Sequence, residues 1–147
     1  MSTLEGPQNI YRTQLPIVAS RINQPPGLKI ALVYDMIYPF SVGGIEIRNY
    51  EFAKRLRLMG HEVHLFGVKL WDGPDVIERD GLVLHGVCRF RSLYDSTGKR
   101  TIADSLKFSF KVVRPLIQEK FDIIDVSTFP YFHCYTCKLV SLIKKTP

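Results

Sequence analysis

The sequence has few cysteines, no long apolar run and no apolar leader, and each shortage excludes a class of protein. Three cysteines among 147 residues exclude a disulfide-stapled scaffold and favour a reducing compartment. No stretch approaches the roughly 18 apolar residues of a membrane-spanning helix. The first residues lack the basic segment and apolar core of a secretory signal. We therefore expect a cytoplasmic protein.

The composition is that of an ordinary globular chain with a basic bias. Hydrophobic residues make up 46% and charged residues 23%, and this composition excludes a disordered or collagen-like chain. A chain of this length can bury enough apolar surface to form one hydrophobic core. The formal net charge of +6 favours an anionic partner: phosphate, nucleic acid or a membrane surface. Nucleic acid is the weakest of these, because the basic residues are not interleaved with stacking aromatic residues. We expect no nucleic-acid partner.

A change in character near residue 28 divides the chain into two parts. Residues 1–27 hold four prolines and no sustained hydrophobic period, which predicts a flexible N-terminal tail. Residues 28–147 alternate strands with helices. This order predicts one α/β domain, Rossmann-like, with an open, mostly parallel sheet and helices on both faces.

Hydrophobic runs and periods indicate the individual elements. A continuous apolar run predicts a buried strand at 28–34. Strands are also expected at 61–68 and 121–127, the last of them buried. A hairpin is expected over 75–87, turning at Asp80-Gly81. Helical spacing predicts helices at 45–60, 101–120 and 131–145. Pro115 should kink the second helix, because proline removes a backbone donor.

Two of these helices carry an apolar stripe that should face the sheet. In the helix at 45–60 the stripe consists of Ile45, Phe52, Leu56 and Met59. In the helix at 101–120 it consists of Ala103, Leu106, Phe110, Val113 and Ile117.

The sharpest local feature is Gly43-Gly44, between the first strand and the first helix. Ligands of open α/β sheets bind outside the carboxyl ends of the strands. Because glycine has no Cβ, a glycine pair there lets a ligand approach the backbone closely. The N-terminus of the following helix attracts phosphate. The pair is equally compatible with a sharp turn that has no ligand. A dinucleotide site is excluded because G-x-G-x-x-G and an acid ending the second strand are both missing, and a Walker-type phosphate loop is missing too.

Residues 29–67, from Lys29 through Gly43-Gly44 to the segment Leu56, Gly60, His61, Glu62 and Val63, closely resemble the opening of family 4 glycosyltransferases. The segment FDIIDVSTFPYF at 121–132 resembles the part of these enzymes that carries the acceptor side. The resemblance covers about residues 28–145. It implies the N-terminal half of a GT-B fold, in which two Rossmann-like domains face each other across a cleft.

The resemblance also implies an activity: transfer of a sugar from a nucleotide-diphosphate donor to an acceptor, with retention and without a metal at the catalytic centre. Gly43 and Gly44 would contact the donor, and a sugar, polyol or lipid-linked molecule would be the acceptor. We expect no cofactor and no metal site. Asp125 and Ser127 occupy positions where many members have histidines, so no histidine role is carried over.

The Glu-x7-Glu signature of the family's nucleotide-binding domain is not found in the sequence. We therefore expect this chain to be the acceptor-side part of an enzyme whose C-terminal domain is missing, and to be inactive alone. A non-catalytic, regulatory Rossmann-like module is the alternative.

Polar residues that follow two of the strands are candidates for acceptor binding. Asp35 follows the first strand, where it would contact an acceptor hydroxyl or cap the loop. Ser127, Thr128 and Tyr131 follow the strand at 121–127, and small polar groups there suit hydrogen bonds to a sugar or polyol.

A basic cluster is the candidate for contact with a membrane surface. Lys107, Lys111 and Arg114 share one helix face, and the loop before them adds Arg89, Arg91, Lys99 and Arg100. Such residues suit an anionic leaflet, the inner face of the membrane, with Phe90 and Tyr94 inserting at headgroup level. A solvated helix face beside a loop explains them equally well.

The remaining cysteines and histidines are interpreted as structural. Cys134-x-x-Cys137 lies too far into its helix for a reactive thiol, and His133 with this pair is too small a set for zinc. His61 and His64 flank a strand start without a partner motif.

Overall fold

The computed structural model describes residues 26–90, 102–128 and 131–147. The elements in chain order are β1 (Lys29–Val33), α1 (Gly44–Leu58), β2 (Glu62–Val68), β3 (Val76–Arg79), β4 (Leu82–Cys88), α2 (Ile102–Lys111), α3 (Val113–Gln118), β5 (Ile123–Val126) and α4 (Phe132–Lys144). Every strand and helix expected from the sequence is present. The tail predicted at 1–27 lies almost wholly outside the described residues.

The strands form one five-stranded sheet in the order β3-β4-β2-β1-β5. β1 pairs in parallel with β2 and with β5, and β2 pairs in parallel with β4. Among the strands of the described residues, only β3 runs antiparallel, paired with β4 through the predicted hairpin. Asp80 and Gly81 both have positive φ, 54° and 72°, as a two-residue turn between twisted strands requires. The mostly parallel sheet is confirmed.

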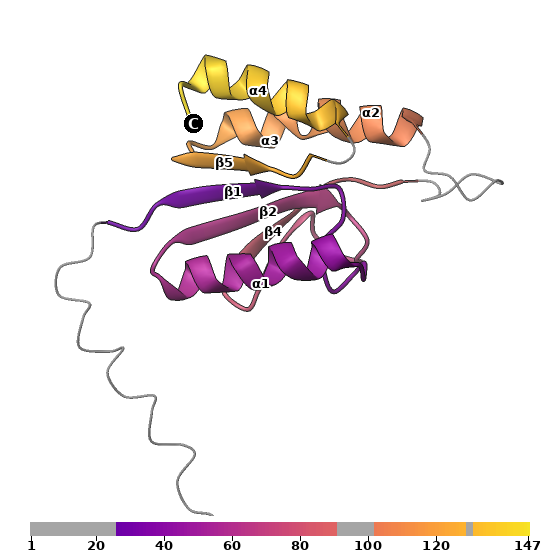
Figure 1. The fold of residues 1–147 in the computed structure, drawn as a ribbon. Coiled ribbons are helices and arrows are strands. Elements are labelled where there is room, and N and C mark those ends of the chain that lie inside the picture. The colour runs from indigo at the N-terminus through magenta and orange to yellow at the C-terminus, as the bar shows by residue number, and fades with distance from the viewer. Residues whose placement is uncertain (1–25, 91–101, 129–130) are drawn as a thin grey trace, which may run out of the picture.

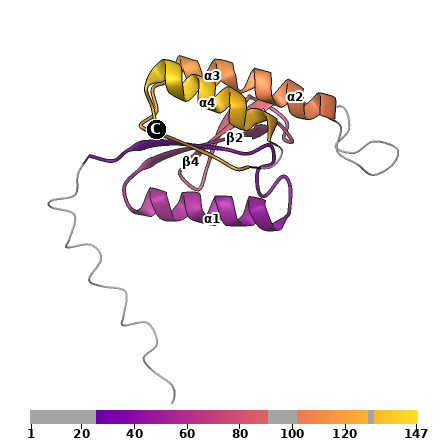
Figure 2. The same ribbon diagram turned by 45° about the horizontal axis from the view of Figure 1, so that its top comes forward.

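Helices cover both faces of the sheet, with α1 on one face and α2, α3 and α4 on the other (Figures 1 and 2). Side chains alternate between two cores along each strand, because successive residues of a strand point to opposite faces. Ile30 and Leu32 belong to the core under α1, whereas Ala31 and Val33 belong to the core under α2 to α4. The expected Rossmann-like α/β architecture is therefore confirmed.

The predicted buried face of α1 was wrong. The structure buries Glu46, Tyr50 and Ala53, and it leaves Ile45, Phe52 and Met59 exposed and Leu56 only half-buried. Ala53 has no bulk to hold the helix away from the sheet. The Tyr50 hydroxyl donates a 2.7 Å hydrogen bond to Asp80 in the β3–β4 turn, which satisfies its polar end. Burial, followed by the Asp80 contact, raises the pKa of Tyr50 to about 12.

The predicted buried face of the helix at 101–120 was also wrong. Ser105, Phe108, Ser109, Val112 and Leu116 are buried. Of the expected stripe, Ala103, Leu106, Phe110 and Ile117 are exposed and Val113 is half-buried. The buried serines cost little because Ser109 donates its hydroxyl to the Ser105 carbonyl at 2.8 Å, and their small volume lets the helix pack closely.

Pro115 interrupts this helix, as predicted. α2 ends at Lys111 and α3 begins at Val113. Hydrogen bonds from Val112 N–H to the Phe108 carbonyl and from Leu116 N–H to the Val112 carbonyl continue on either side of the break. The proline at 115 has no N–H to donate to the Lys111 carbonyl, so the ladder is interrupted at this point.

β5 is half-buried and does not match the expected buried strand. It lies at the edge of the sheet in the described part of the chain, with Asp125 exposed. Its Ile124 N–H donates to the carbonyl of Pro147 at 3.0 Å, so the chain returns to this edge after α4. Among the described residues, no helix combines the length and the apolar character needed to cross a bilayer.

Candidate functional site

The candidate site lies where the carboxyl ends of β1 and β5 meet the N-terminus of α1. Asp35 follows β1, Ser127 and Thr128 follow β5, and α1 begins at Gly44. β1 and β5 are parallel neighbours, with Val33 opposite Val126. The topology therefore brings together segments more than 80 residues apart, at the edge where open α/β sheets bind ligands.

Gly43 and Gly44 differ in what surrounds them. Gly43 is the N-cap of α1 in extended backbone (φ −159°, ψ 169°), and an added Cβ would overlap the carboxylate of Glu46. An added Cβ at Gly44 would meet open space: apart from adjoining backbone, no atom of the described residues lies within 4 Å of it. Packing against Glu46 therefore explains why position 43 is glycine. No packing contact within the described fold requires glycine at position 44.

Glu46 determines the electrostatics of this helix N-terminus. Its side chain is buried in the first turn of α1, and its Oε1 accepts a 3.4 Å hydrogen bond from the Ser41 hydroxyl. A carboxylate here interacts favourably with the positive end of the helix dipole. It also repels an approaching phosphate, so an anion would have to approach from the open Gly44 side.

A groove runs from this N-terminus along α1 beside β5. Its upper part is lined by Ile45 and Arg48 of α1 and by Asp125, Val126, Ser127 and Thr128. Its continuation is lined by Arg48, Asn49, Glu51, Phe52, Arg55 and Asp125. Ile45 and Phe52, which were predicted to face the core, line this groove instead.

Asn49 connects the helix to the end of β5. Its side-chain amide donates a 3.0 Å hydrogen bond to the Ser127 hydroxyl. Sequence reasoning missed Arg48, Asn49 and Arg55 as site residues. The only signal in the sequence is their spacing after Gly44, which places Arg48 one turn into the helix and on the same side as Arg55.

The other two predicted acceptor residues lie in different environments. The Asp35 side chain is 1% exposed, and its backbone carbonyl accepts a 2.8 Å hydrogen bond from Val68 N–H. Tyr131 is the N-cap of α4, with 65% of its surface exposed. Neither lines the groove, which brings Ser127 and Thr128 together with Arg48.

In a comparison with known protein families, residues 42–145 match Glycosyltransferase Family 4. This range covers more than two thirds of the chain, from the glycine pair to the end of α4. The chain belongs to Glycosyltransferase Family 4. No individual curated protein matched the chain.

Three residues of the basic cluster predicted to contact a membrane lie on one exposed helical surface. Lys107, Lys111 and Arg114 are exposed, and Lys107 Nζ donates to the Arg89 carbonyl at 2.9 Å. Phe90 packs against the core under α2, so it is poorly placed to enter a membrane. Arg91, Lys99, Arg100 and Tyr94 lie outside the described residues.

The thiols of the family 4 chain have the environment of structural cysteines, as expected. Cys137 is buried, and burial raises its pKa to about 12. Burial also raises the pKa of Cys88 and of Cys134. His61 is structural too, since its Nδ1 accepts a 3.1 Å hydrogen bond from Leu28 N–H.

His133 fixes α4 to the end of β5. Its Nε2–H donates to the Ser127 carbonyl at 2.7 Å, and its ring meets Phe108 edge-on. Burial lowers its pKa below 6.5, against a smaller opposing effect of the Ser127 carbonyl. The neutral ring is therefore the form that the fold accommodates.

Acidification should destabilise the fold through His133. Because the folded pKa lies below the unfolded value, the stabilisation is complete above about pH 6.5 and is lost as the pH falls below it. We expect the urea midpoint to drop between about pH 7.5 and about pH 5 by more in the wild type than in His133→Gln, which keeps a donor for Ser127 but does not titrate. Equal drops would refute this role for His133.

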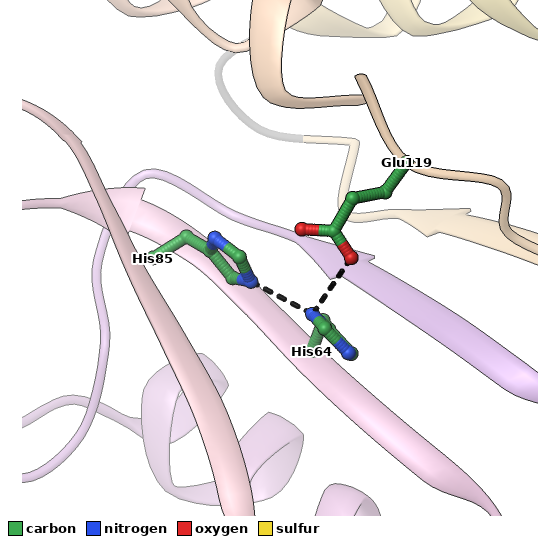
Figure 3. A group of neighbouring side chains, drawn as sticks. All are labelled: His64, His85 and Glu119. Atoms are coloured by element: carbon green, nitrogen blue, oxygen red, sulfur yellow. Dashed lines mark hydrogen bonds and ion pairs between the residues drawn. The ribbon is translucent and has the colours of Figure 1, made fainter. Parts of the chain in front are cut away.

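Sequence reasoning also missed a cluster around His64. His64 Nδ1 and His85 Nε2 are 2.7 Å apart, and Glu119 approaches the same His64 nitrogen at 3.9 Å (Figure 3). Burial, followed by the charge on His64, lowers the pKa of His85 to about 4. The sequence offers no partner motif for His64, and the fold supplies its partners. Only the fold brings together residues from β2, β4 and the end of α3.

Proposed function

We propose that the chain is the acceptor-side half of a glycosyltransferase that moves a sugar from a nucleotide-diphosphate donor to a sugar, polyol or lipid-linked acceptor. The observation that carries this proposal is the groove between α1 and the end of β5. Ser127, Thr128, Arg48 and Asp125 line it, so residues with hydroxyl, guanidinium and carboxylate groups border one groove. Such groups hydrogen-bond the hydroxyls of a polyol and fix its orientation.

The donor would approach the open side of Gly44. The absence of any described side chain within 4 Å of an added Cβ supports this position, as do the free N–H groups of the first turn of α1. In this proposal, donor phosphates bind backbone amides here and basic groups of a nucleotide-binding domain opposite. Stabilisation of the departing diphosphate by preorganised donors would supply much of the catalysis.

The finer chemistry of the proposal rests on the family resemblance. Transfer would proceed with retention of configuration and without a metal at the catalytic centre. Asp35 and Tyr131 stay candidates for the acceptor side, and reversible contact of the basic helix surface with anionic lipid stays a prediction. A cytoplasmic location fits a nucleotide-sugar donor.

Turnover should require a nucleotide-binding domain, and Arg48→Ala should weaken acceptor use. We would measure release of nucleotide diphosphate from a panel of nucleotide sugars with polyol or lipid acceptors, by this chain alone and with a supplied C-terminal domain. We expect negligible turnover by this chain alone.

In the active pair of domains, Arg48→Ala should raise the acceptor KM about tenfold, which corresponds to about 1.4 kcal/mol.

Arg57→Ala is the matched control, because Arg57 lies on α1 but donates to the Gly81 carbonyl, away from the groove. Robust turnover by the isolated chain would refute the need for a second domain. An unchanged KM in Arg48→Ala would remove the groove as the acceptor site.

A further inference from the structure

The His64 cluster lies at the opposite side of the sheet from the candidate groove. His64 and His85 project from β2 and β4 toward the layer of α2 to α4, and Glu119 follows α3 directly. Lys29 at the start of β1 and Glu62 at the start of β2 complete the cluster, which places it toward the amino ends of the strands. The glycine pair and Ser127 lie at the carboxyl ends.

Potential ligand atoms of three residues lie close together. One atom from each of His64, His85 and Glu119 lies within 4.8 Å of the other two. Two imidazole nitrogens and a carboxylate oxygen form a donor set that zinc uses, with bonds of about 2.0–2.2 Å. Tetrahedral bonds of that length separate the ligand atoms by roughly 3.3 Å. The observed separations of 2.7 and 3.9 Å lie on either side of that value.

Glu62 orients the central ligand. Its Oε1 lies 2.7 Å from His64 Nε2, so that nitrogen carries the proton and donates. His64 Nδ1 is thereby left with its lone pair toward His85 and Glu119. A carboxylate that holds the second nitrogen of a ligating histidine is the usual outer support of metal sites.

The charge and the walls of the cluster also favour a cation. Two carboxylates, Glu62 and Glu119, face the single ammonium of Lys29 at 3.0 and 2.8 Å. With neutral imidazoles the cluster has an excess of one negative charge. Phe66 stacks on His85 with ring centres 4.3 Å apart, and Phe121 meets His64 edge-on at 5.2 Å. These rings pack against both imidazoles and hold their orientation.

A path to the cluster exists on the side of His85. This residue lines an open groove between β4 and the helices α2 and α3, together with Asp75 and Gln118. In a metal-bound form, an ion would reach the imidazole from there, and water would supply a fourth ligand.

We propose that His64 Nδ1, His85 Nε2 and a Glu119 oxygen bind one divalent transition-metal ion, for which zinc is the best match. His85 would carry its ring proton on Nδ1 in the bound form. The ion would replace the hydrogen bond between the histidines and would join β2, β4 and the end of α3. Its role is to stabilise the fold, and it is compatible with metal-independent transfer at the other end of the sheet.

The test is titration of the metal-free full chain with zinc by calorimetry, followed by thermal unfolding and by cobalt substitution. We expect one zinc per chain, a melting temperature that rises with zinc concentration, and the intense visible absorption of tetrahedral cobalt. Glu119→Gln keeps the shape of this partly exposed side chain but removes its negative charge. It should weaken binding at least tenfold. His85→Phe should abolish both binding and the thermal shift. Glu62→Gln should weaken binding about 10–100-fold.

His133→Gln is the matched control, because it alters another buried histidine outside the cluster and should leave zinc binding unchanged. Circular dichroism of each metal-free variant verifies that it folds. The proposal is overturned if zinc does not bind saturably, or if Glu119→Gln and His85→Phe bind like the wild type. Loss of binding in Cys134→Ser/Cys137→Ser alone would also overturn it, because the thiols would then be the ligands.

Discussion

Gly44→Val should reduce turnover of the active two-domain enzyme about 100-fold while the melting temperature stays nearly unchanged. A valine side chain at this position enters space that is empty in the fold, so the packing of the protein should not suffer. In the proposed complex the same space holds the donor. Displacement of a reacting group by about 1 Å is enough to cost roughly 100-fold in rate. Steady-state kinetics and thermal unfolding of the same preparations measure the two effects.

Two variants make this result specific. Gly44→Ala adds a single methyl group and should show a smaller loss, because the donor can shift slightly. Gly43→Ala should behave differently: its Cβ meets the Glu46 carboxylate, so the melting temperature should fall with the rate. If Gly44→Val unfolds as readily as it loses activity, the glycine is a structural residue and the donor proposal loses its main local support.

The element types followed from the sequence because they depend on local patterns. A continuous apolar run marked β1 as a strand buried on both faces, and Asp80-Gly81 marked the hairpin because its turn needs positive φ. Pro115 marked the break between α2 and α3 for an equally local reason, a missing N–H. None of these predictions depends on which helix or strand packs against which.

The faces of the helices could not be derived in this way. A pattern that ranks residues by hydrophobicity overlooks small and half-polar residues at close contacts. Ala53 and the two serines of α2 are buried because they allow close approach. Tyr50 is buried because Asp80, 30 residues away, accepts its hydroxyl proton. The apolar residues displaced from the core then line the surface, Phe52 in the candidate groove among them.

The make-up of the candidate groove followed from the sequence only in part, for a related reason. Ser127 and Thr128 were identified because they follow a strand, and strand ends of a parallel sheet share an edge. Arg48 was missed as a partner because its position beside Asp125 depends on how α1 is rotated about its own axis. The pairing of His64 with His85 depends on the register of β2 with β4, in which Phe66 lies opposite His85. Neither rotation nor register is a property of one segment.

Phe108→Ala should destabilise the fold by about 3–5 kcal/mol, whereas Phe110→Ala should change its stability by less than about 0.5 kcal/mol. The two residues are separated by one position on α2, and the hydrophobic pattern assigned the core position to Phe110. The structure instead buries Phe108 completely, at 0% exposure, against His133 and the core under α2 to α4. Phe110 is 71% exposed.

Urea unfolding of the two variants decides between these faces, because both remove the same atoms from the same helix and so have nearly the same effect on helix propensity. The loss in Phe108→Ala combines the lost transfer of an aromatic ring with the cavity that remains beside His133. That cavity should also loosen the hydrogen bond from His133 to the Ser127 carbonyl, so the end of β5 should exchange its amide protons faster. Comparable losses in both variants would mean that α2 is rotated relative to the structure. A larger loss in Phe110→Ala would restore the face that the hydrophobic pattern predicted, and with it a different lining for the groove beside His85.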